Sequence, residues 1–330
     1  MGDNKRDGDK RMKLLAAIDL GGTNVALGFG TPQGELLHSA SFPTEGNLGP
    51  EHVLQRIAWF VEDQLPAVLP AGAQIAAVGM GLPGRLDAQR RRTEFLPNLA
   101  TQWREVPVAE TLEASLRCPV FLLNDARLAG LGELDFGHGR QFRDFLFVTL
   151  GTGIGGAVVL DGHLRLGPSG AAGELGHQSI DPNGPICGCG ARGCLEAMAS
   201  ASALTAEGLR LMRIGQAPHL ASLLKGDLNL LSVELMATAE DAALEGAIAE
   251  TGRRLGLGMA NLVTALHPEG IVFSGGMAQL GDRLLGPARQ EMLRRVRMFS
   301  AANVEMLPSA LGAHAALLGG LALAARRGQL

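Results

Sequence analysis

The sequence predicts an α/β fold with two α/β domains, and three observations lead to this prediction. Short apolar runs, typical of buried strands, alternate with segments of helical periodicity along most of the chain. A pattern of strand, glycine-rich turn and returning strand occurs near Asp19 and again near Thr149, about 130 residues later. The length of 330 residues suits two domains of ~100–200 residues each, or one large domain. Two unrelated hairpins are the alternative explanation of the repeated pattern.

The first half of the chain is predicted to alternate strands and helices. An apolar run that includes Asp19 is followed by Gly-Gly-Thr and a second apolar run, which indicates a strand, a tight turn and a strand. Val53, Ile57 and Val61 recur at helical spacing and indicate an amphipathic helix. The predicted strands cover 13–20, 24–30, 35–42, 76–80 and 119–123, and the predicted helices cover 51–65, 107–116 and 125–134.

The second half is predicted to begin like the first and then to become mostly helical. Asp161 and Gly162 between two apolar runs are typical of a hairpin turn. The predicted strands cover 144–150, 153–160, 163–167 and 270–274, and the predicted helices cover 241–266, a segment ending near 297, and 313–326. We expect a loose tail over 1–12, a smaller α/β domain over 13–122 that the C-terminal helix (about 312–330) completes, and a larger α/β domain over 123–311 that carries a zinc loop.

Composition and charge argue against several classes of protein. The formal net charge of −4 does not suggest broad electrostatic binding to nucleic acid or to an anionic membrane surface. The longest apolar stretch, 311–325, is shorter than the ~20 residues of a membrane helix. The charged N-terminus is not followed by an apolar signal-peptide core, so we expect a cytoplasmic protein whose four cysteines form no disulfides.

Two glycine-rich turns are candidate phosphate-binding loops. Glycines allow backbone angles that side chains forbid, so successive N–H groups can face one anion, and Asp19 is placed to hold Mg²⁺ through water. The predicted phosphate-binding residues are Asp19, Gly21, Gly22, Thr23 and Asn24 in the first turn and Gly151, Thr152 and Gly153 in the second. The second turn also matches the dinucleotide pattern G-x-G-x-x-G, but a strand follows it where that pattern requires a helix. A simple tight turn is the alternative for each loop, whereas two loops at matching points favour a pair that holds the phosphates of ATP.

One histidine and three cysteines have the composition of a structural zinc site. His177, Cys187, Cys189 and Cys194 supply an imidazole and three thiolates, and glycines between the cysteines let a short loop fold around a metal. Free thiols or a redox pair are the alternatives. A closed set of four ligands leaves no open position for catalysis, so the metal is expected to be architectural. Because both phosphate loops lie elsewhere in the chain, nucleotide binding is expected to depend little on this metal.

Asp125 follows the last predicted strand of the first half and opens a helix. Taken alone, either Asn124 or Asp125 is most simply a helix N-cap. A carboxylate at the carboxyl end of a strand in an α/β protein is also well placed to face a ligand.

Six motifs, in this order, resemble those of the ROK family of sugar kinases, repressors and open reading frames. They are DLGGTN, LPN, NDA, LGTGIGGAVV, GELGH and CGCGARGCLEA, and the resemblance spans roughly residues 14–326. It implies an actin-like (ribonuclease H-like) ATPase fold, with two α/β domains around a central cleft. The repressor branch carries an additional N-terminal helix-turn-helix, whereas only about 12 residues precede the first predicted strand here, so a kinase is expected.

The resemblance also implies roles for single residues. Asp125 is similar to the general base that takes a proton from the 6-hydroxyl of the sugar as this attacks the γ-phosphate of ATP. Gly275 and Gly276 are similar to the loop on the adenosine side, with a plain turn as the alternative. His177 is expected to bind zinc through one ring nitrogen and to face the sugar with the other. The family's sugar contacts fall on Asn98, Asn124, Asp125, Glu174, His177 and Glu196, and solvated surface charge is the alternative for the two glutamates.

The expected activity is ATP-dependent phosphorylation of glucose, with ATP, Mg²⁺ and structural Zn²⁺ as cofactors and a homodimer as the assembly. Glu174 in GELGH matches the pattern of glucose-specific members, whereas the loop DPNGPICGCG is similar to that of N-acetylmannosamine kinases, in which a histidine replaces Glu174. A kinase for N-acetylmannosamine, N-acetylglucosamine or fructose is therefore the alternative. A non-catalytic sugar-responsive regulator and an acetyl-CoA or dinucleotide-binding enzyme are further alternatives, and polyphosphate or ADP as the phosphoryl donor stays open.

Overall fold

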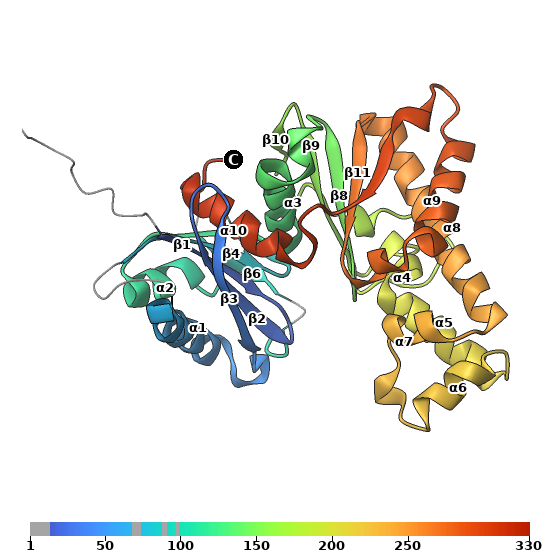
Figure 1. The fold of residues 1–330 in the computed structure, drawn as a ribbon, viewed down its shortest axis with the longest axis horizontal. Coiled ribbons are helices and arrows are strands. Elements are labelled where there is room, and N and C mark those ends of the chain that lie inside the picture. The colour runs from blue at the N-terminus through green and yellow to red at the C-terminus, as the bar shows by residue number, and fades with distance from the viewer. Residues whose placement is uncertain (1–13, 68–73, 88–90, 97–98) are drawn as a thin grey trace, which may run out of the picture. The chain divides into compact units, whose positions relative to one another are not determined.

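The computed structural model describes residues 14–67, 74–87, 91–96 and 99–330 (Figure 1). The chain forms two compact units. Unit 1 comprises the chain up to Gly132 together with Ala316–Leu330, and unit 2 comprises Glu133–Ala315. No helix in the described part of the chain is both long enough and apolar enough to cross a bilayer.

Unit 1 is built on a five-stranded sheet in the order β3-β2-β1-β4-β7. Its strands are β1 (Leu14–Leu20), β2 (Asn24–Gly30), β3 (Leu36–Pro43), β4 (Ile75–Leu82) and β7 (Val120–Asn124), and β5 (Arg85–Asp87) and β6 (Arg92–Phe95) form a separate antiparallel pair. Strand β1 pairs antiparallel with β2 and parallel with β4, which in turn pairs parallel with β7. The carboxyl ends of β1, β4 and β7 therefore lie at one edge of the sheet.

Apolar side chains cover both faces of this sheet. The helices of unit 1 are α1 (Pro50–Gln64), α2 (Val108–Leu116), the first part of α3 (Asp125–Phe136) and α10 (Ala315–Ala325). Ile18 packs into the core that includes α1 and α2, whereas its neighbour Ala17 packs on the opposite face against α10. Because successive residues of a strand point to opposite faces, the continuous apolar run of β1 is typical of a strand covered on both sides.

Unit 2 contains a second five-stranded sheet, in the order β10-β9-β8-β11-β12. Its strands are β8 (Phe145–Leu150), β9 (Ile154–Leu160), β10 (His163–Leu164), β11 (Gly270–Ser274) and β12 (Glu305–Pro308). Its helices are α4 (Leu195–Ala199), α5 (Ala201–Arg213), α6 (Pro218–Leu224), α7 (Val233–Thr238), α8 (Ala242–Leu266) and α9 (Asp282–Arg295). Buried residues of β8 and β11 form one core with α8 and α9, which run side by side in Figure 1.

The two sheets have the same plan, which confirms the repeated pattern that the sequence predicts. Each sheet begins with an antiparallel hairpin, β1–β2 or β8–β9. A later strand, β4 or β11, pairs in parallel with the first strand of the hairpin, and a further strand, β7 or β12, pairs in parallel with that one. The two glycine-rich turns connect the strands of the two hairpins. They therefore occupy equivalent positions in the two units.

Some elements differ from the prediction. The strand expected over 163–167 is only two residues long, because the chain leaves the hairpin after Leu164. The short strands β5, β6 and β12 were not predicted, since three or four residues give too little alternation to recognise. Strand β4 continues to Leu82, two residues beyond the predicted end at residue 80.

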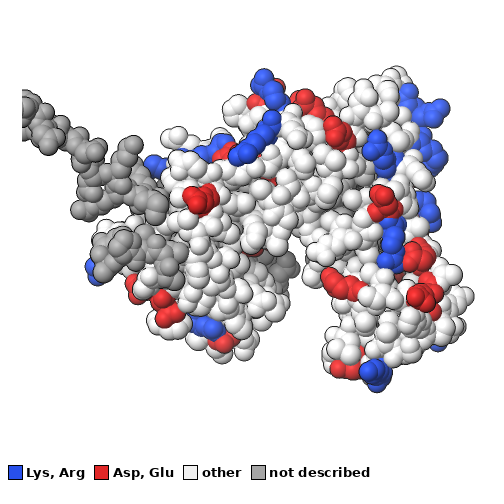
Figure 2. Space-filling view, in the orientation of Figure 1, with Lys and Arg blue, Asp and Glu red and all other residues white. Residues whose placement is uncertain are grey.

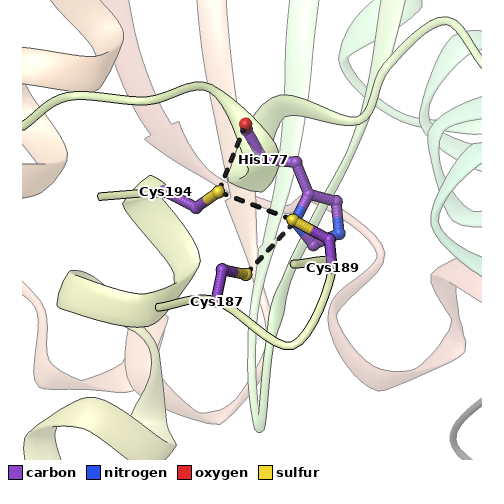
Figure 3. A group of neighbouring side chains, drawn as sticks. All are labelled: His177, Cys187, Cys189 and Cys194. Atoms are coloured by element: carbon purple, nitrogen blue, oxygen red, sulfur yellow. Dashed lines mark hydrogen bonds between the residues drawn. The ribbon is translucent and has the colours of Figure 1, made fainter. Parts of the chain in front are cut away.

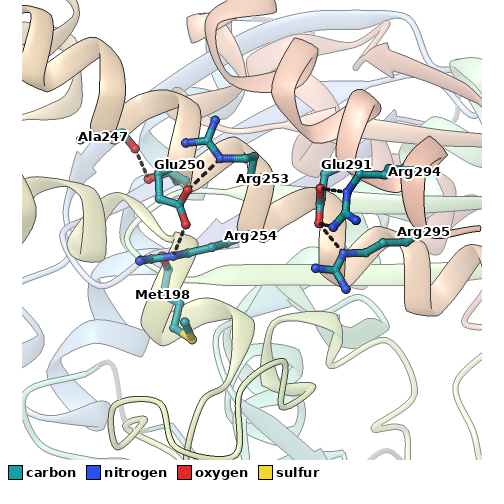
Figure 4. A network of polar contacts seen from close by, with 9 residues as sticks. Met198, Ala247, Glu250, Arg253, Arg254, Glu291, Arg294 and Arg295 are labelled. Carbon is teal, nitrogen blue, oxygen red and sulfur yellow. Dashed lines mark hydrogen bonds and ion pairs between the residues drawn. The ribbon is translucent and has the colours of Figure 1, made fainter.

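Charged side chains on the face seen in Figure 2 are interspersed, and much of that face is uncharged. On α9, Glu291 accepts hydrogen bonds from Arg294 and Arg295 (Figure 4). The hydrogen bonds from Arg294 are the largest cause that lowers the pKa of Glu291, to about 2. This cluster therefore stabilises the fold above the ordinary carboxyl pKa of 4.5, and its contribution is lost as the pH falls toward 2.

Candidate active site

Two carboxylates of unit 1 meet at the carboxyl ends of neighbouring parallel strands. Asp19 of β1 pairs with Gly81 of β4, and Leu82 of β4 pairs with Asn124 at the end of β7, directly before Asp125. A Cβ atom at position 81 would lie 3.0 Å from Oδ1 of Asp19 and 3.5 Å from Cα of Asp125. Glycine at this position therefore leaves the space that the Asp19 carboxylate occupies beside Asp125.

The helix-capping role that the sequence left open belongs to Asn124. Its Oδ1 accepts hydrogen bonds from the backbone N–H groups of Ala126 (3.1 Å) and Arg127 (3.3 Å), and its Nδ2 donates to the carbonyl oxygen of Gly84 (3.2 Å). Asp125 is the first residue of α3, and its Oδ1 accepts a hydrogen bond of 2.7 Å from the N–H of Ala126. A carboxylate in the first turn of a helix is stabilised by the helix dipole. Asn124 thus fixes the start of the helix that carries Asp125.

The buried carboxylate of Asp19 has the properties expected of a cation ligand. Its Oδ1 is buried and has no hydrogen-bond partner among the described residues. Burial, followed by the charge of Asp125, raises the pKa of Asp19 from 3.8 to about 7. A buried carboxylate oxygen without a partner is costly unless a cation neutralises it, and carboxylate oxygens suit Mg²⁺. The residues present at this edge of the sheet therefore fit the predicted Mg²⁺ site.

Asp19→Asn is expected to stabilise the protein without ligands at pH 8. The pKa is higher in the folded state, so the free energy of unfolding falls as the pH rises from 3.8 to about 7 and stays low above it. Asparagine is neutral throughout, so the variant gains stability relative to the wild type over this range, by at most roughly 4 kcal/mol. Thermal unfolding at pH 5 and pH 8 measures the difference, and Asp63→Asn, on the exposed side of α1, is the matched control. A gain that is the same at both pH values would contradict the prediction.

The first phosphate loop, between β1 and β2, is a tight turn with an exposed tip. The N–H of Gly21 donates to the carbonyl oxygen of Asn24 (2.9 Å), and Thr44 Oγ1 donates to the carbonyl oxygen of Gly21 (2.7 Å). The backbone of Gly21 does not adopt the left-handed region, so the predicted reason for glycine is wrong at this position. Glycine is required because a Cβ atom would lie 2.8 Å from the oxygen of Asn24. Gly22 and Thr23 are exposed, which leaves backbone N–H groups and a hydroxyl accessible to an anion.

The second phosphate loop and the predicted adenosine-side loop lie together in unit 2. Residues 151–153 follow β8, and Gly275 follows β11. These strands are parallel neighbours in which Thr149 pairs with Ser274, so the two loops leave the same edge of the sheet. The structure therefore brings Gly151, Thr152 and Gly153 close to Gly275 and Gly276, which the sequence alone did not place together.

The four predicted metal ligands converge in unit 2 (Figure 3). Their ligand atoms all lie within 4.8 Å of one another, with 3.7 Å between the sulfur atoms of Cys189 and Cys194 and 3.6 Å from Nδ1 of His177 to Sγ of Cys187. Tetrahedral zinc with Zn–S bonds near 2.3 Å separates its sulfur ligands by about 3.8 Å, so the side chains fit such a site. Burial, then hydrogen bonding to the other two thiols, raises the pKa of Cys194 to about 12, so a cation is needed to hold it as a thiolate.

The two ring nitrogens of His177 have different neighbours. Nδ1 points toward Cys187, and Nε2 lies 3.8 Å from Oε2 of Glu174. A metal-binding histidine commonly donates its other ring N–H to a carboxylate, which fixes the orientation of the ring. Both side chains are partly exposed, so a ligand can reach Glu174 and the outer edge of the imidazole.

Glu196 has a contact that the sequence did not predict. Its Oε2 accepts a hydrogen bond of 2.9 Å from the backbone N–H of Ile154, directly after the second phosphate loop. Its Oε1 lies 3.8 Å from Sγ of Cys187. No sequence pattern identifies this link, because Ile154 and Glu196 are 42 residues apart in the chain.

The remaining predicted sugar contacts are distributed between the units. Asn124 and Asp125 belong to unit 1, whereas Glu174, His177 and Glu196 belong to unit 2. Asn98 lies outside the described residues.

Comparisons with known proteins agree with these features. The sequence model of the ROK family matches residues 15–327. The glucokinase of Thermotoga maritima is 34% identical over 326 residues, which is 96% of this chain and 98% of the relative. The xylose repressor of Bacillus subtilis is 31% identical over 245 residues, which is 74% of this chain and 60% of the repressor. A solved structure of a ROK family glucokinase from Streptomyces griseus, in complex with glucose and AMPPNP, has a TM-score of 0.82 and 31% identity, and covers 96% of this chain and 100% of that one.

This structural similarity confirms the predicted actin-like α/β fold with two domains. The family match extends over nearly the whole chain and includes the glycine-rich loops, Asp125 and the cluster of histidine and cysteines. The chain belongs to the ROK family.

Proposed function

We propose that this protein is an ATP-dependent sugar kinase that transfers the γ-phosphoryl group of ATP to the 6-hydroxyl of glucose. The observation that carries the proposal is the position of Asp125, at the start of α3 and beside the buried carboxylate of Asp19. The glucokinases among the relatives, and the related structure that contains glucose and an ATP analogue, support it.

Asp125 acts as the general base. Its carboxylate accepts the proton of the 6-hydroxyl as the hydroxyl oxygen attacks the γ-phosphorus, and the bond from phosphorus to the bridging oxygen of ADP breaks. Such a base contributes ~10²–10⁴-fold to the rate. Asn124 holds Asp125 in place through the helix cap, so the carboxylate need not reorganise during the reaction.

The remaining residues bind and orient the two substrates. The N–H groups of the loops at 21–24 and 151–153 bind phosphate oxygens, and the loop at Gly275 and Gly276 binds on the adenosine side. Asp19 would hold the Mg²⁺ that accompanies ATP, and when bound there this ion would supply positive charge beside the phosphates. Glu174 and His177 contact sugar hydroxyls, together with Asn98, Asn124 and Glu196, and the metal held by His177, Cys187, Cys189 and Cys194 is structural zinc.

The proposal is tested by measuring ADP release from Mg·ATP with a panel of sugars. Glucose is expected to give the highest kcat/KM among glucose, mannose, fructose, N-acetylglucosamine and N-acetylmannosamine. A higher kcat/KM for N-acetylmannosamine would agree with a sugar kinase but would contradict glucose as its substrate. Replacing ATP with polyphosphate or ADP in the same assay tests the donor. Sugar binding by calorimetry without phosphorylation of any sugar would favour the second candidate, a sugar-responsive regulator, which the repressors among the relatives support.

The homodimer, the cytoplasmic location and the absence of nucleic-acid binding stay predictions. Light scattering on the purified protein tests the assembly, and a gel-shift assay with unrelated DNA tests nucleic-acid binding.

A further inference from the structure

The second phosphate loop is bonded to one neighbouring stretch of chain, residues 196–202 of α4 and the start of α5. The N–H of Ala201 donates to the carbonyl oxygen of Gly151 (2.9 Å), and Ser202 Oγ donates to the carbonyl oxygen of Thr152 (2.8 Å). Glu196, in α4, accepts the N–H of Ile154 (2.9 Å). Two loop residues and Ile154, which follows the loop, thus each have a hydrogen bond to the stretch 196–202.

The Glu196 carboxylate also lies in close contact with the loop itself. A Cβ atom at Gly153 would lie 2.4 Å from Oε2 of Glu196. Only glycine leaves room for the carboxylate at this point, so the path of the loop and the position of Glu196 depend on each other.

The position of α4 depends in turn on the metal cluster. The helix has five residues and begins directly after Cys194, so it is too short to be stable without tertiary contacts. Its second residue, Glu196, lies 3.8 Å from Sγ of Cys187 through Oε1. At its other end, Arg254 of α8 donates a hydrogen bond of 3.2 Å to the carbonyl oxygen of Met198 (Figure 4). Helix α8 therefore contacts α4 at both ends, since the buried side chain of Leu195 also lies against Gly258 of α8, and the start of α4 is held in addition by Cys194 directly before it.

We infer that Glu196 is a positioning residue, which couples metal binding at His177, Cys187, Cys189 and Cys194 to the geometry of the phosphate loop at 151–153. This reverses the expectation that nucleotide binding depends little on the metal. When the cysteines are not held together, the start of α4 loses its anchor at Cys194 and keeps only the packing of Leu195, so the bond from Ile154 to Glu196 is weakened. The inference rests on the proposed function only in assigning nucleotide phosphates to this loop.

Amide hydrogen exchange of residues 150–156, followed by mass spectrometry, tests the coupling without using activity. Removing the metal from the wild type with a chelator is expected to speed exchange in this segment about tenfold or more, and adding Zn²⁺ back should restore protection. The affinity for Mg·AMPPNP, measured by calorimetry, should weaken about fivefold or more under the same conditions. Unchanged exchange and unchanged affinity on metal removal would overturn the inference.

Variants separate a positioning role from a sugar contact. Glu196→Ala, with its metal retained, should show the same faster exchange, whereas Glu196→Gln should keep most of the protection because an amide oxygen still accepts the N–H of Ile154. Glu174→Gln, which alters the other glutamate beside His177, is the matched control and should leave exchange at 150–156 unchanged. Equal protection in the wild type and Glu196→Ala would also overturn the inference. If metal removal unfolds the chain, as circular dichroism would show, these metal-loaded variants still decide it.

The two proposals can fail separately. No binding of Mg·AMPPNP and no phosphorylation of any sugar by the metal-loaded wild type would reject the proposed function. The exchange rates would still show whether the metal fixes the loop.

Discussion

Asp125→Asn is expected to lower kcat by a factor of about 10² or more, while glucose still binds. The amide has nearly the same shape as the carboxylate and still accepts a hydrogen bond from a hydroxyl, but it cannot take up the proton. Because Asn124 accepts hydrogen bonds from the N–H groups of Ala126 and Arg127, and an asparagine at 125 still offers an oxygen to Ala126, the start of the helix should persist in the variant. Steady-state kinetics, with calorimetry for glucose binding, measure the two effects separately.

The same variant has a second readout, which tests the proximity of the two carboxylates independently of activity. The charge of Asp125 is one of the two causes that raise the pKa of Asp19. Removing that charge should lower the pKa of Asp19, which NMR titration of the side-chain carboxyl carbon can follow. Asp135→Asn, the same substitution later in α3, is the matched control and should retain kcat. If the kcat of Asp125→Asn is near that of the wild type, Asp125 is not the general base and is only a residue of the first helical turn.

The fold could be predicted because its two hairpins leave clear signals in the sequence. Strands β1 and β8 are apolar on both faces, and each is followed by glycines and a second apolar run. Helix α8 could be predicted because twenty-five residues give a long periodic pattern. Helices α4, α6 and α7 have five to seven residues, which is less than two turns, so their periodicity cannot be recognised.

The residues of the candidate site could be predicted from the sequence, but the contacts between them could not. The ligands around His177 fall within eighteen residues, so spacing alone indicates them. The proximity of Asp19 to Asp125 depends on the order of β1, β4 and β7, and strand order is a property of the whole sheet. The bond between Glu196 and Ile154 likewise depends on where α4 packs. Sequence reasoning therefore treated the predicted phosphate loop at 151–153 and the metal cluster as separate, whereas Glu196 contacts both Ile154 and Cys187.

Cys189→Ala is expected to lose the metal and most of the activity. Between residues 178 and 193 the buried positions are Gly184, Cys187 and Gly193, and among the large apolar side chains only the partly buried Ile180 packs against the core, so little apolar burial orders this segment. Metal ligation supplies that order, and apparent binding free energies for structural zinc are roughly 10–16 kcal/mol near pH 7. Two thiolates and an imidazole leave the tetrahedral set incomplete, so zinc should fall from one per chain toward zero in elemental analysis.

Loss of the metal in Cys189→Ala should raise the KM values for both substrates in the residual activity. On the outer side, His177 loses its fixed orientation beside Glu174, so the KM for glucose in the residual activity should rise. On the inner side, α4 loses its fixed start, so the KM for ATP should rise as well. Cys118→Ala is the matched control, because Cys118 is a buried thiol of unit 1 outside the cluster, and it should keep its zinc and both KM values. Zinc bound at one per chain in Cys189→Ala, or no zinc in wild-type protein prepared without chelator, would contradict the assignment of the ligands. A rise in the KM for glucose without a rise in the KM for ATP would show that the metal affects sugar binding only. Glu196 would then be a sugar contact that does not position the phosphate loop.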